Sequence, residues 1–150
     1  IILQTKEIYI DRSITMTRKE AREAGFIVIF EYEFQKLDAD QLMELYYNYR
    51  SEVDGQKDYL ENLVHATLEH AAEIDDLIAQ NARGWSLARL SKVTLATLRI
   101  GICEMLYNDE IPDSIAINEA VQLAKDYEGE KASAFVNGVL SAIYKAQKAE

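Results

Sequence analysis

The stretch LSKVTLATLRIGICEMLY, residues 90–107, decides the fold class of this 150-residue chain. Apolar side chains fall on nearly every side of a helical wheel drawn for it, so no broad polar face stands out. A helix of this kind is typical of a protein core, where neighbours contact it from several directions. We therefore expect this segment to be the central helix against which the other elements pack.

The rest of the chain shows the three- and four-residue spacing of amphipathic helices. Thr17 and Glu20 have the spacing of a capping box, which opens a helix running to about residue 35. The segment 57–80 is predicted to be one unbroken helix, and further helices are expected from about residues 38, 114 and 130. Apart from a weak alternation over residues 6–10, no segment argues for a sheet. The sequence predicts an all-α protein of about six to seven helices.

Asn137-Gly138 would ordinarily predict a β-hairpin, because both residue types tolerate positive φ. The residues on both sides are spaced helically, so we place the pair inside a helix, where Gly costs about 1 kcal/mol relative to Ala. One face of this helix consists of small residues, namely Ala134, Gly138, Ser141 and Ala142. We expect a second surface to pack closely there: a neighbouring helix or, as the alternative, RNA or a partner protein.

The composition limits the classes of function. A net charge of −10 repels nucleic acid at long range, so contact with RNA or DNA would require a local basic patch. The single cysteine, Cys103, excludes a disulfide framework, and we expect a buried thiol in a cytoplasmic protein. No apolar run approaches the roughly 18 to 20 residues that cross a membrane, so no membrane contact is expected.

Residues 1–15 carry scattered charges and do not show the basic segment, apolar segment and cleavage site of a signal peptide. We expect them to be an upstream extension or a remnant of cloning. Met16 then opens a single domain that covers residues 16–150.

Motifs of catalysis are absent from the sequence. It contains no P-loop, no Rossmann glycine pattern and no nucleophile elbow. His65 and His70 are five residues apart, about 140° around a helix, so they cannot bind one metal as an i, i+4 pair can. We therefore expect a protein that is not an enzyme and that has no cofactor and no metal site.

Arg18, Lys19 and Arg22 lie in the opening turns of the first helix, within about a quarter of its circumference. Cations at a helix N-terminus oppose the helix dipole, and the N–H groups at that end help to bind phosphate. An anion site is one of two interpretations of this cluster. The alternative is a surface cluster paired with Glu20 and Glu23.

Arg99 is a cation within the apolar segment 90–107 and needs a partner, because an unpaired buried charge is costly. Glu104 is five residues away and poorly aligned on the same helix. We expect a structural ion pair between Arg99 and Glu119 of the following helix.

Three motifs, in this order, resemble the bacterial transcription antitermination factor NusB family: WSLARLSKVTLATLRIGICEML (85–106), IPDSIAINEAVQLAKDY (111–127) and EKASAFVNGVLSAI (130–143). The resemblance extends from about Met16 to Ala146 and is looser in the first helix. It implies a compact arrangement of two helical bundles without catalytic activity. It also implies binding of boxA-type single-stranded RNA together with NusE, a ribosomal small-subunit protein. The complex would join elongating RNA polymerase, notably on ribosomal RNA operons.

The resemblance assigns RNA contacts to two short stretches, with Arg18, Lys19, Arg22, Lys131, Ser133 and Phe135 as the matching residues. It assigns Phe30 to the protein partner. Because Glu20 and Glu23 interrupt the basic run, we expect weak RNA binding alone and tighter binding with the partner. Alone, the protein is expected to be a monomer or a weak homodimer.

Two other functions stay open at this point. The same fold could serve as the RNA-guiding domain of a ribosomal RNA methyltransferase. A purely structural helical module is the other, and the tyrosine-rich segment LMELYYNY, residues 42–49, favours it because exposed aromatic side chains often form interfaces.

Overall fold

The computed structural model describes residues 16–49 and 55–149, and these contain seven α-helices and one 3₁₀ turn but no strand. The elements are α2 (Arg18–Gln35), α3 (Ala39–Tyr49), α4 (Lys57–Glu69), α5 (Ala71–Asn81), η1 (Leu87–Arg89), α6 (Lys92–Tyr107), α7 (Asp113–Glu128) and α8 (Glu130–Ala149). The predicted all-α fold is confirmed. The expectations for residues 1–15 lie outside the described residues. Within the described part, no helix combines the length and apolar character needed to cross a membrane.

Side-chain caps fix where several helices begin. Thr17 Oγ1 accepts from the Glu20 amide at 3.1 Å, and Glu20 Oε1 accepts from the Thr17 amide at 2.9 Å. Asp38 caps α3 by accepting from the amide of Gln41 at 2.8 Å. Ser91 Oγ accepts from the backbone of α6 at 3.0 Å. These groups satisfy amides that have no partner inside their own helix, as the sequence pattern predicts.

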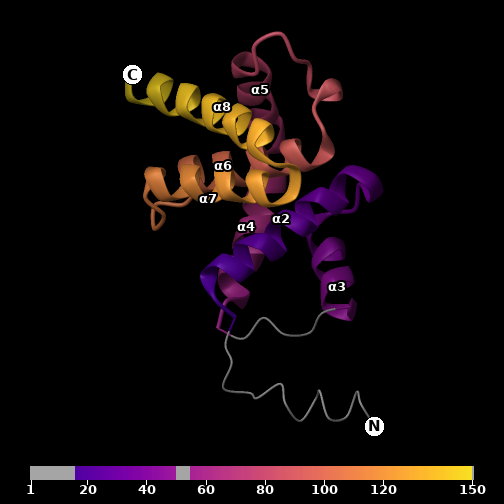
Figure 1. Cartoon of the computed structure of the whole chain (residues 1–150). Coiled ribbons are helices and arrows are strands. Elements are labelled where there is room, and N and C mark those ends of the chain that lie inside the picture. The colour runs from indigo at the N-terminus through magenta and orange to yellow at the C-terminus, as the bar shows by residue number, and fades with distance from the viewer. Residues whose placement is uncertain (1–15, 50–54, 150) are drawn as a thin grey trace.

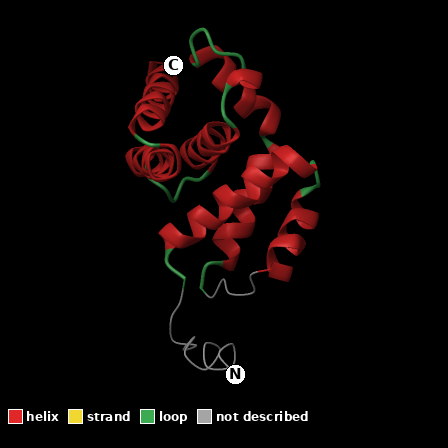
Figure 2. Ribbon diagram, turned by 45° about the vertical axis from the view of Figure 1, so that its right-hand side comes forward, coloured by secondary structure: helices red, strands yellow, loops and turns green. Residues whose placement is uncertain are grey.

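The helices form two groups, which Figures 1 and 2 show from different sides. The first group contains α2, α3 and α4, and the second contains α5, α6, α7 and α8. α6 contacts α2 and α4 of the first group as well as its own neighbours. Every residue of α6 from Thr94 to Met105 is buried, so the prediction of a central helix is confirmed.

The predicted unbroken helix over residues 57–80 is wrong, because the chain breaks at His70 between α4 and α5. Just before the break, the Thr67 hydroxyl donates to the carbonyl of Leu63 at 2.6 Å, a contact that bends helices. The His70 ring stacks on Tyr107 with centroids 3.7 Å apart and planes 4° apart. The break lets α4 pack in the first group and α5 in the second.

The expectation that a neighbouring helix packs closely at Gly138 is also wrong, while the alternative of RNA or a partner protein there stays a prediction. Asn137 and Gly138 lie inside α8 as predicted, but no heavy atom lies within 4 Å of a Cβ built on Gly138. The helix packs through other residues, namely Val136, Val139, Leu140 and Ile143. Close packing occurs instead at Gly101, where a Cβ would lie 2.9 Å from Ala120 Cβ. The small residues of α8 therefore face outward.

Candidate nucleic-acid interface

Arg22 is buried where α2 crosses α6. Its Nε donates to Glu104 Oε1 at 2.6 Å and its Nη2 donates to Oε2 at 3.1 Å, and 3 % of the residue is exposed. Tyr59 of α4 also donates to Glu104, at 2.7 Å, and burial together with the charge of Glu104 raises the pKa of Tyr59. The burial argues against the predicted role in RNA binding and makes Arg22 a structural arginine.

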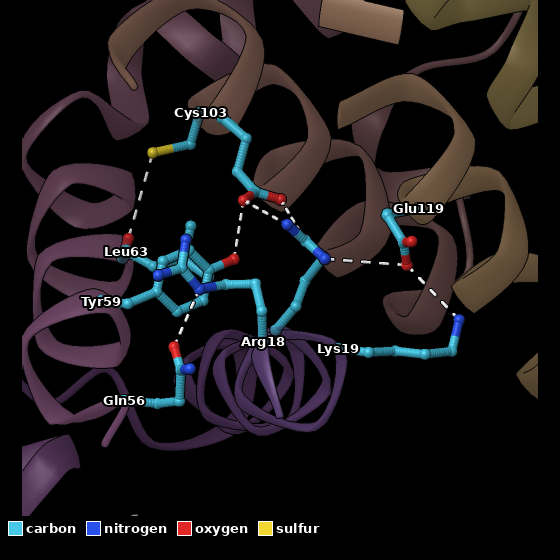
Figure 3. A network of polar contacts seen from close by, with 9 residues as sticks. Arg18, Lys19, Gln56, Tyr59, Leu63, Cys103 and Glu119 are labelled. Atoms are coloured by element: carbon cyan, nitrogen blue, oxygen red, sulfur yellow. Dashed lines mark hydrogen bonds and ion pairs between the residues drawn. The ribbon is translucent and has the colours of Figure 1, made fainter. Parts of the chain in front are cut away.

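Arg18 and Lys19 are exposed in the first turn of α2, but each already has a partner (Figure 3). The Arg18 guanidinium carbon lies 4.0 Å from the centroid of the Tyr59 ring, and its Nε donates to Gln56 at 2.8 Å. Lys19 Nζ lies 3.4 Å from Glu119 Oε2. Exposed contacts of this kind are weak, so both cations can exchange them for a phosphate. Two of the three cations in the predicted cluster, Arg18 and Lys19, are therefore accessible to a ligand.

The alternative pairing of this cluster with Glu20 and Glu23 does not form in the structure. Glu20 closes the capping box with Thr17. The hydrogen bond from the Thr17 amide lowers the pKa of the Glu20 carboxyl group. Glu23 accepts from the Tyr127 hydroxyl at 2.6 Å. Both carboxylates are thus directed to partners other than the basic residues.

Arg99 is buried, but the expected pair with Glu119 is wrong. The Nε and Nη2 of Arg99 donate to the two carboxylate oxygens of Asp75, each at 2.9 Å, and its Nη1 donates to Glu33. Glu119 instead faces α2, with its Oε2 3.7 Å from Arg22 Nη1. Asp75 and Glu33 lie 24 and 66 residues away in the sequence, so helix periodicity could not reveal them.

A hollow of about 340 Å³ lies where the loop before α6 meets the junction of α7 and α8. We call it the junction hollow; its lining consists of Trp85, Arg89, Leu90, Ser91, Thr94, Glu128, Lys131, Ala132 and Phe135. It unites Lys131 and Phe135, predicted from the sequence, with Trp85 and Arg89, which the analysis of single residues missed. Aromatic rings beside cations are typical of sites that bind single-stranded nucleic acid.

Two glycines give the junction hollow its shape. Gly84 has a φ of +77°, which few other residues adopt, and it allows the Trp85 amide to donate back to Ala82 at 2.8 Å. Gly129 has a φ of +95° and is the single residue that separates α7 from α8 in Figure 1. These two turns bring Trp85 and the first turn of α8 together.

The side chains of the junction hollow differ in their exposure and in the contacts they already make within the protein. Trp85 is 48 % exposed, and the Arg89 guanidinium carbon lies 5.3 Å from its ring centroid. Lys131 is exposed and makes no ion pair among the described residues, while Phe135 is half-buried. The Ser133 hydroxyl donates to the carbonyl of Glu130 at 2.8 Å, within the first turn of α8. Lys131 is thus the lysine here that is most available to a phosphate.

An exposed aromatic pair lies on α2 near the start of α6. Phe30 is half-buried, Phe34 is 60 % exposed, and their ring centroids lie 5.0 Å apart. Glu33, between them in the sequence, contacts Lys92 of α6 at 3.5 Å. Ser91 and Thr94, which flank this part of α6 in the sequence, line the junction hollow. We call Phe30 and Phe34 the α2 aromatic patch.

Groups suited to metal binding or covalent chemistry are absent from the described residues. No set of three or more histidine, cysteine, aspartate or glutamate side chains there could hold a metal ion. His65 contacts Asp40 at 2.9 Å, whereas His70 contacts Glu73 at 2.9 Å and stacks on Tyr107. Burial raises the pKa of the Cys103 thiol to about 11, which keeps it protonated and unreactive near neutral pH.

Comparison with known proteins identifies the family. The family model described as the NusB family matches residues 19–145. This chain belongs to the NusB family. The protein named transcription antitermination protein NusB from Ruminiclostridium cellulolyticum is 40 % identical over 130 residues, which cover 87 % of this chain and 90 % of that protein. Its namesake from Listeria monocytogenes is 39 % identical over 128 residues, covering 85 % and 96 %.

Solved structures of the family agree in fold. T. maritima NusB matches with a TM-score of 0.79 and 33 % identity, covering 88 % of this chain and 93 % of the other. A crystal structure of the antitermination factors NusB and NusE in complex with dsRNA matches with a TM-score of 0.78 and 32 % identity, covering 86 % and 96 %. The chain is thus an antitermination factor of this family and not an enzyme.

Proposed function

We propose that residues 16–150 act as one domain that binds single-stranded boxA-type RNA together with NusE, and that the pair joins elongating RNA polymerase, notably on ribosomal RNA operons. Such a factor acts on nascent transcripts in the cytoplasm. The observation that carries the proposal is the junction hollow, in which Lys131 and Phe135 lie with Trp85 and Arg89. The related structure of NusB and NusE in complex with dsRNA supports NusE and RNA as partners, while the single-stranded form of the RNA is part of the proposal.

The RNA-binding surface combines the junction hollow with the start of α2. Lys131 and Phe135 supply a cation and a ring in the hollow, and Ser133 supplies a hydroxyl on the same helix turn. Arg18 and Lys19 add two exposed cations on α2. Arg22 has no place in this surface, because it is enclosed with Glu104.

NusE is proposed to bind at the α2 aromatic patch. Phe34 exposes an apolar ring that no neighbouring helix covers, and Phe30 extends the apolar surface toward α6. Exposed aromatic side chains are typical of protein interfaces. The patch and the junction hollow share no residue, so RNA and NusE can occupy the protein together. Without NusE the protein is a monomer or a weak homodimer.

The net charge of −10 opposes RNA binding, so NusE should strengthen it by adding positive surface. The test is a titration of boxA-like RNA with and without NusE at two salt concentrations, followed by fluorescence anisotropy of labelled RNA. We expect a clearly lower Kd with NusE. Equal affinity with and without NusE would contradict the proposal.

A variant at Lys131 tests the site itself. Lys131→Ala should weaken RNA binding severalfold in the presence of NusE and reduce the salt dependence by about one phosphate contact. Lys145→Ala is the matched control, because Lys145 is also exposed on α8 but lies outside the junction hollow. If both variants bind RNA like the unchanged protein, the junction hollow is not the RNA site.

A further inference from the structure

The junction hollow contains a carboxylate, Glu128, that phosphate binding does not explain. We propose that the hollow holds one unstacked nucleobase, and that Glu128 selects a base with an exocyclic amino group: adenine, cytosine or guanine rather than uracil. This inference rests on the proposed RNA-binding function. The inference assigns selectivity for the type of base to a site that is otherwise described by its aromatic side chains and its cations.

The walls of the junction hollow suit a single flat base. Trp85 and Phe135 contribute aromatic rings to the lining, and Leu90 and Ala132 contribute further apolar side chains. The volume of about 340 Å³ is at the lower end of the range for ligand pockets and leaves room for one nucleobase. Bases splayed out of a single strand stack on aromatic rings and on Arg guanidinium groups, which Trp85 and Arg89 offer.

Glu128 is held in place at the rim of the hollow. Its Oε1 accepts from the hydroxyls of Ser91 and Thr94, the latter at 3.2 Å. The Ser91 oxygen is itself fixed, because it caps α6 by accepting from the Thr94 amide at 3.0 Å. The second oxygen of Glu128, Oε2, has no hydrogen-bond partner among the described residues. Glu128 is exposed, so its Oε1 is fixed by two hydroxyls while its Oε2 is open to solvent and to a ligand.

The chemistry of the four bases decides which donor fits. A carboxylate repels phosphate and accepts only from N–H or O–H groups. Adenine, cytosine and guanine each carry an amino group on the edge used for base pairing, whereas uracil has one N–H between two carbonyl oxygens. A fixed carboxylate attracts the first three and repels the carbonyls of uracil. Lys131 and Arg89 of the same lining can neutralise the phosphates on either side.

The test compares eight-residue oligocytidine and oligouridine, which differ at this base edge but have the same backbone charge. Binding to the protein in complex with NusE is followed by anisotropy at constant salt and by the fluorescence of Trp85, the single tryptophan of this chain. We expect oligocytidine to bind about tenfold more tightly, as one charge-assisted hydrogen bond predicts, and to quench Trp85. Trp85→Leu identifies the Trp85 signal and should weaken both oligomers about tenfold.

Glu128→Gln separates base selection from a simple effect of charge. The amide both donates and accepts, so the preference for oligocytidine should fall toward one while the melting temperature stays unchanged. Glu130→Gln is the matched control: it removes the same charge two residues away, at a side chain that does not line the hollow, and should keep the preference. If Glu128→Gln tightens both oligomers equally, the carboxylate acts by charge alone and the inference is overturned.

The outcomes also separate this inference from the proposed function. If both oligomers bind with equal affinity and boxA-like RNA binds tightly, the base pocket is wrong and the proposed function stands. If no RNA binds even with NusE present, both are wrong.

Discussion

Two regions, the crossing of α2 over α6 and the outward side of α8, differ from what their sequences suggest in opposite ways. The crossing is buried where the sequence suggests a binding surface, and the side of α8 is open where the sequence suggests close packing. At the crossing, Arg22 belongs to a basic cluster that indicates RNA binding, yet it is enclosed with Glu104 and Tyr59. On α8, Gly138 belongs to a face of small residues that indicates close packing, yet nothing in the described structure contacts that face at Gly138. The comparison teaches that residue type shows what a side chain can do, while burial decides what it does.

Loss of Arg22 should have the largest effect on stability. Arg22→Ala leaves the buried carboxylate of Glu104 without its ion-pair partner, which typically costs about 3–5 kcal/mol in the free energy of unfolding. Urea unfolding followed by circular dichroism measures this loss. Lys19→Ala, on the same helix but exposed, is the control and should have little effect. A stable Arg22→Ala protein that has lost RNA binding would restore the interpretation of Arg22 as an RNA contact.

A second ion pair between α2 and α6, that of Glu33 with Arg99, should make stability depend on pH. Burial alone would raise the pKa of Glu33, but the hydrogen bond and charge of Arg99 outweigh it and hold the pKa below 4.5. Glu33 thus stabilises the fold above its ordinary pKa, and this contribution disappears as the pH falls through the lowered value. Glu33→Gln should be less stable than the unchanged protein at pH 7, and the difference should shrink toward pH 3. A difference that is constant across this range, measured by urea unfolding, would show that the charge of Glu33 is irrelevant.

The smallest expected effect is at Gly138. Gly138→Ala should stabilise the protein by about 0.4–1 kcal/mol, because Ala is favoured in an exposed helix and no atom obstructs its Cβ. Gly101→Ala is the contrasting variant, and crowding against Ala120 and Leu140 should destabilise it by about 1–3 kcal/mol. Thermal unfolding of both variants decides the point. A destabilised Gly138→Ala protein would mean that the outward side of α8 is packed after all.

Most of the fold follows from local patterns in the sequence. The capping box at Thr17 and the all-round apolar character of residues 90–107 depend on neighbours in the chain, and the structure bears out both. The break at His70 does not follow in this way: it coincides with stacking of His70 on Tyr107, 37 residues away, and with a change of packing partner between α4 and α5. Periodicity alone cannot show where a continuous amphipathic pattern changes its packing partner.

The candidate site was less accessible to sequence analysis. Lys131 and Phe135 were found through family resemblance, but the partners of Arg22 and Arg99 depend on how distant helices cross. Trp85 and Arg89 had a signal that could have been used. They lie four residues apart in the short segment between Gly84 and the central helix, and a cation at this distance from a tryptophan can contact its ring.

The contact between Arg22 and Glu104 has a consequence for synthesis of the chain. The two residues are 82 positions apart, so α2 leaves the ribosome long before its partner exists. Until residue 104 emerges, the start of α2 has a guanidinium that no side chain of the first helical group neutralises in the finished fold. The N-terminal half therefore cannot complete its final packing before α6 has emerged, and the two groups of helices are expected to fold together from that point.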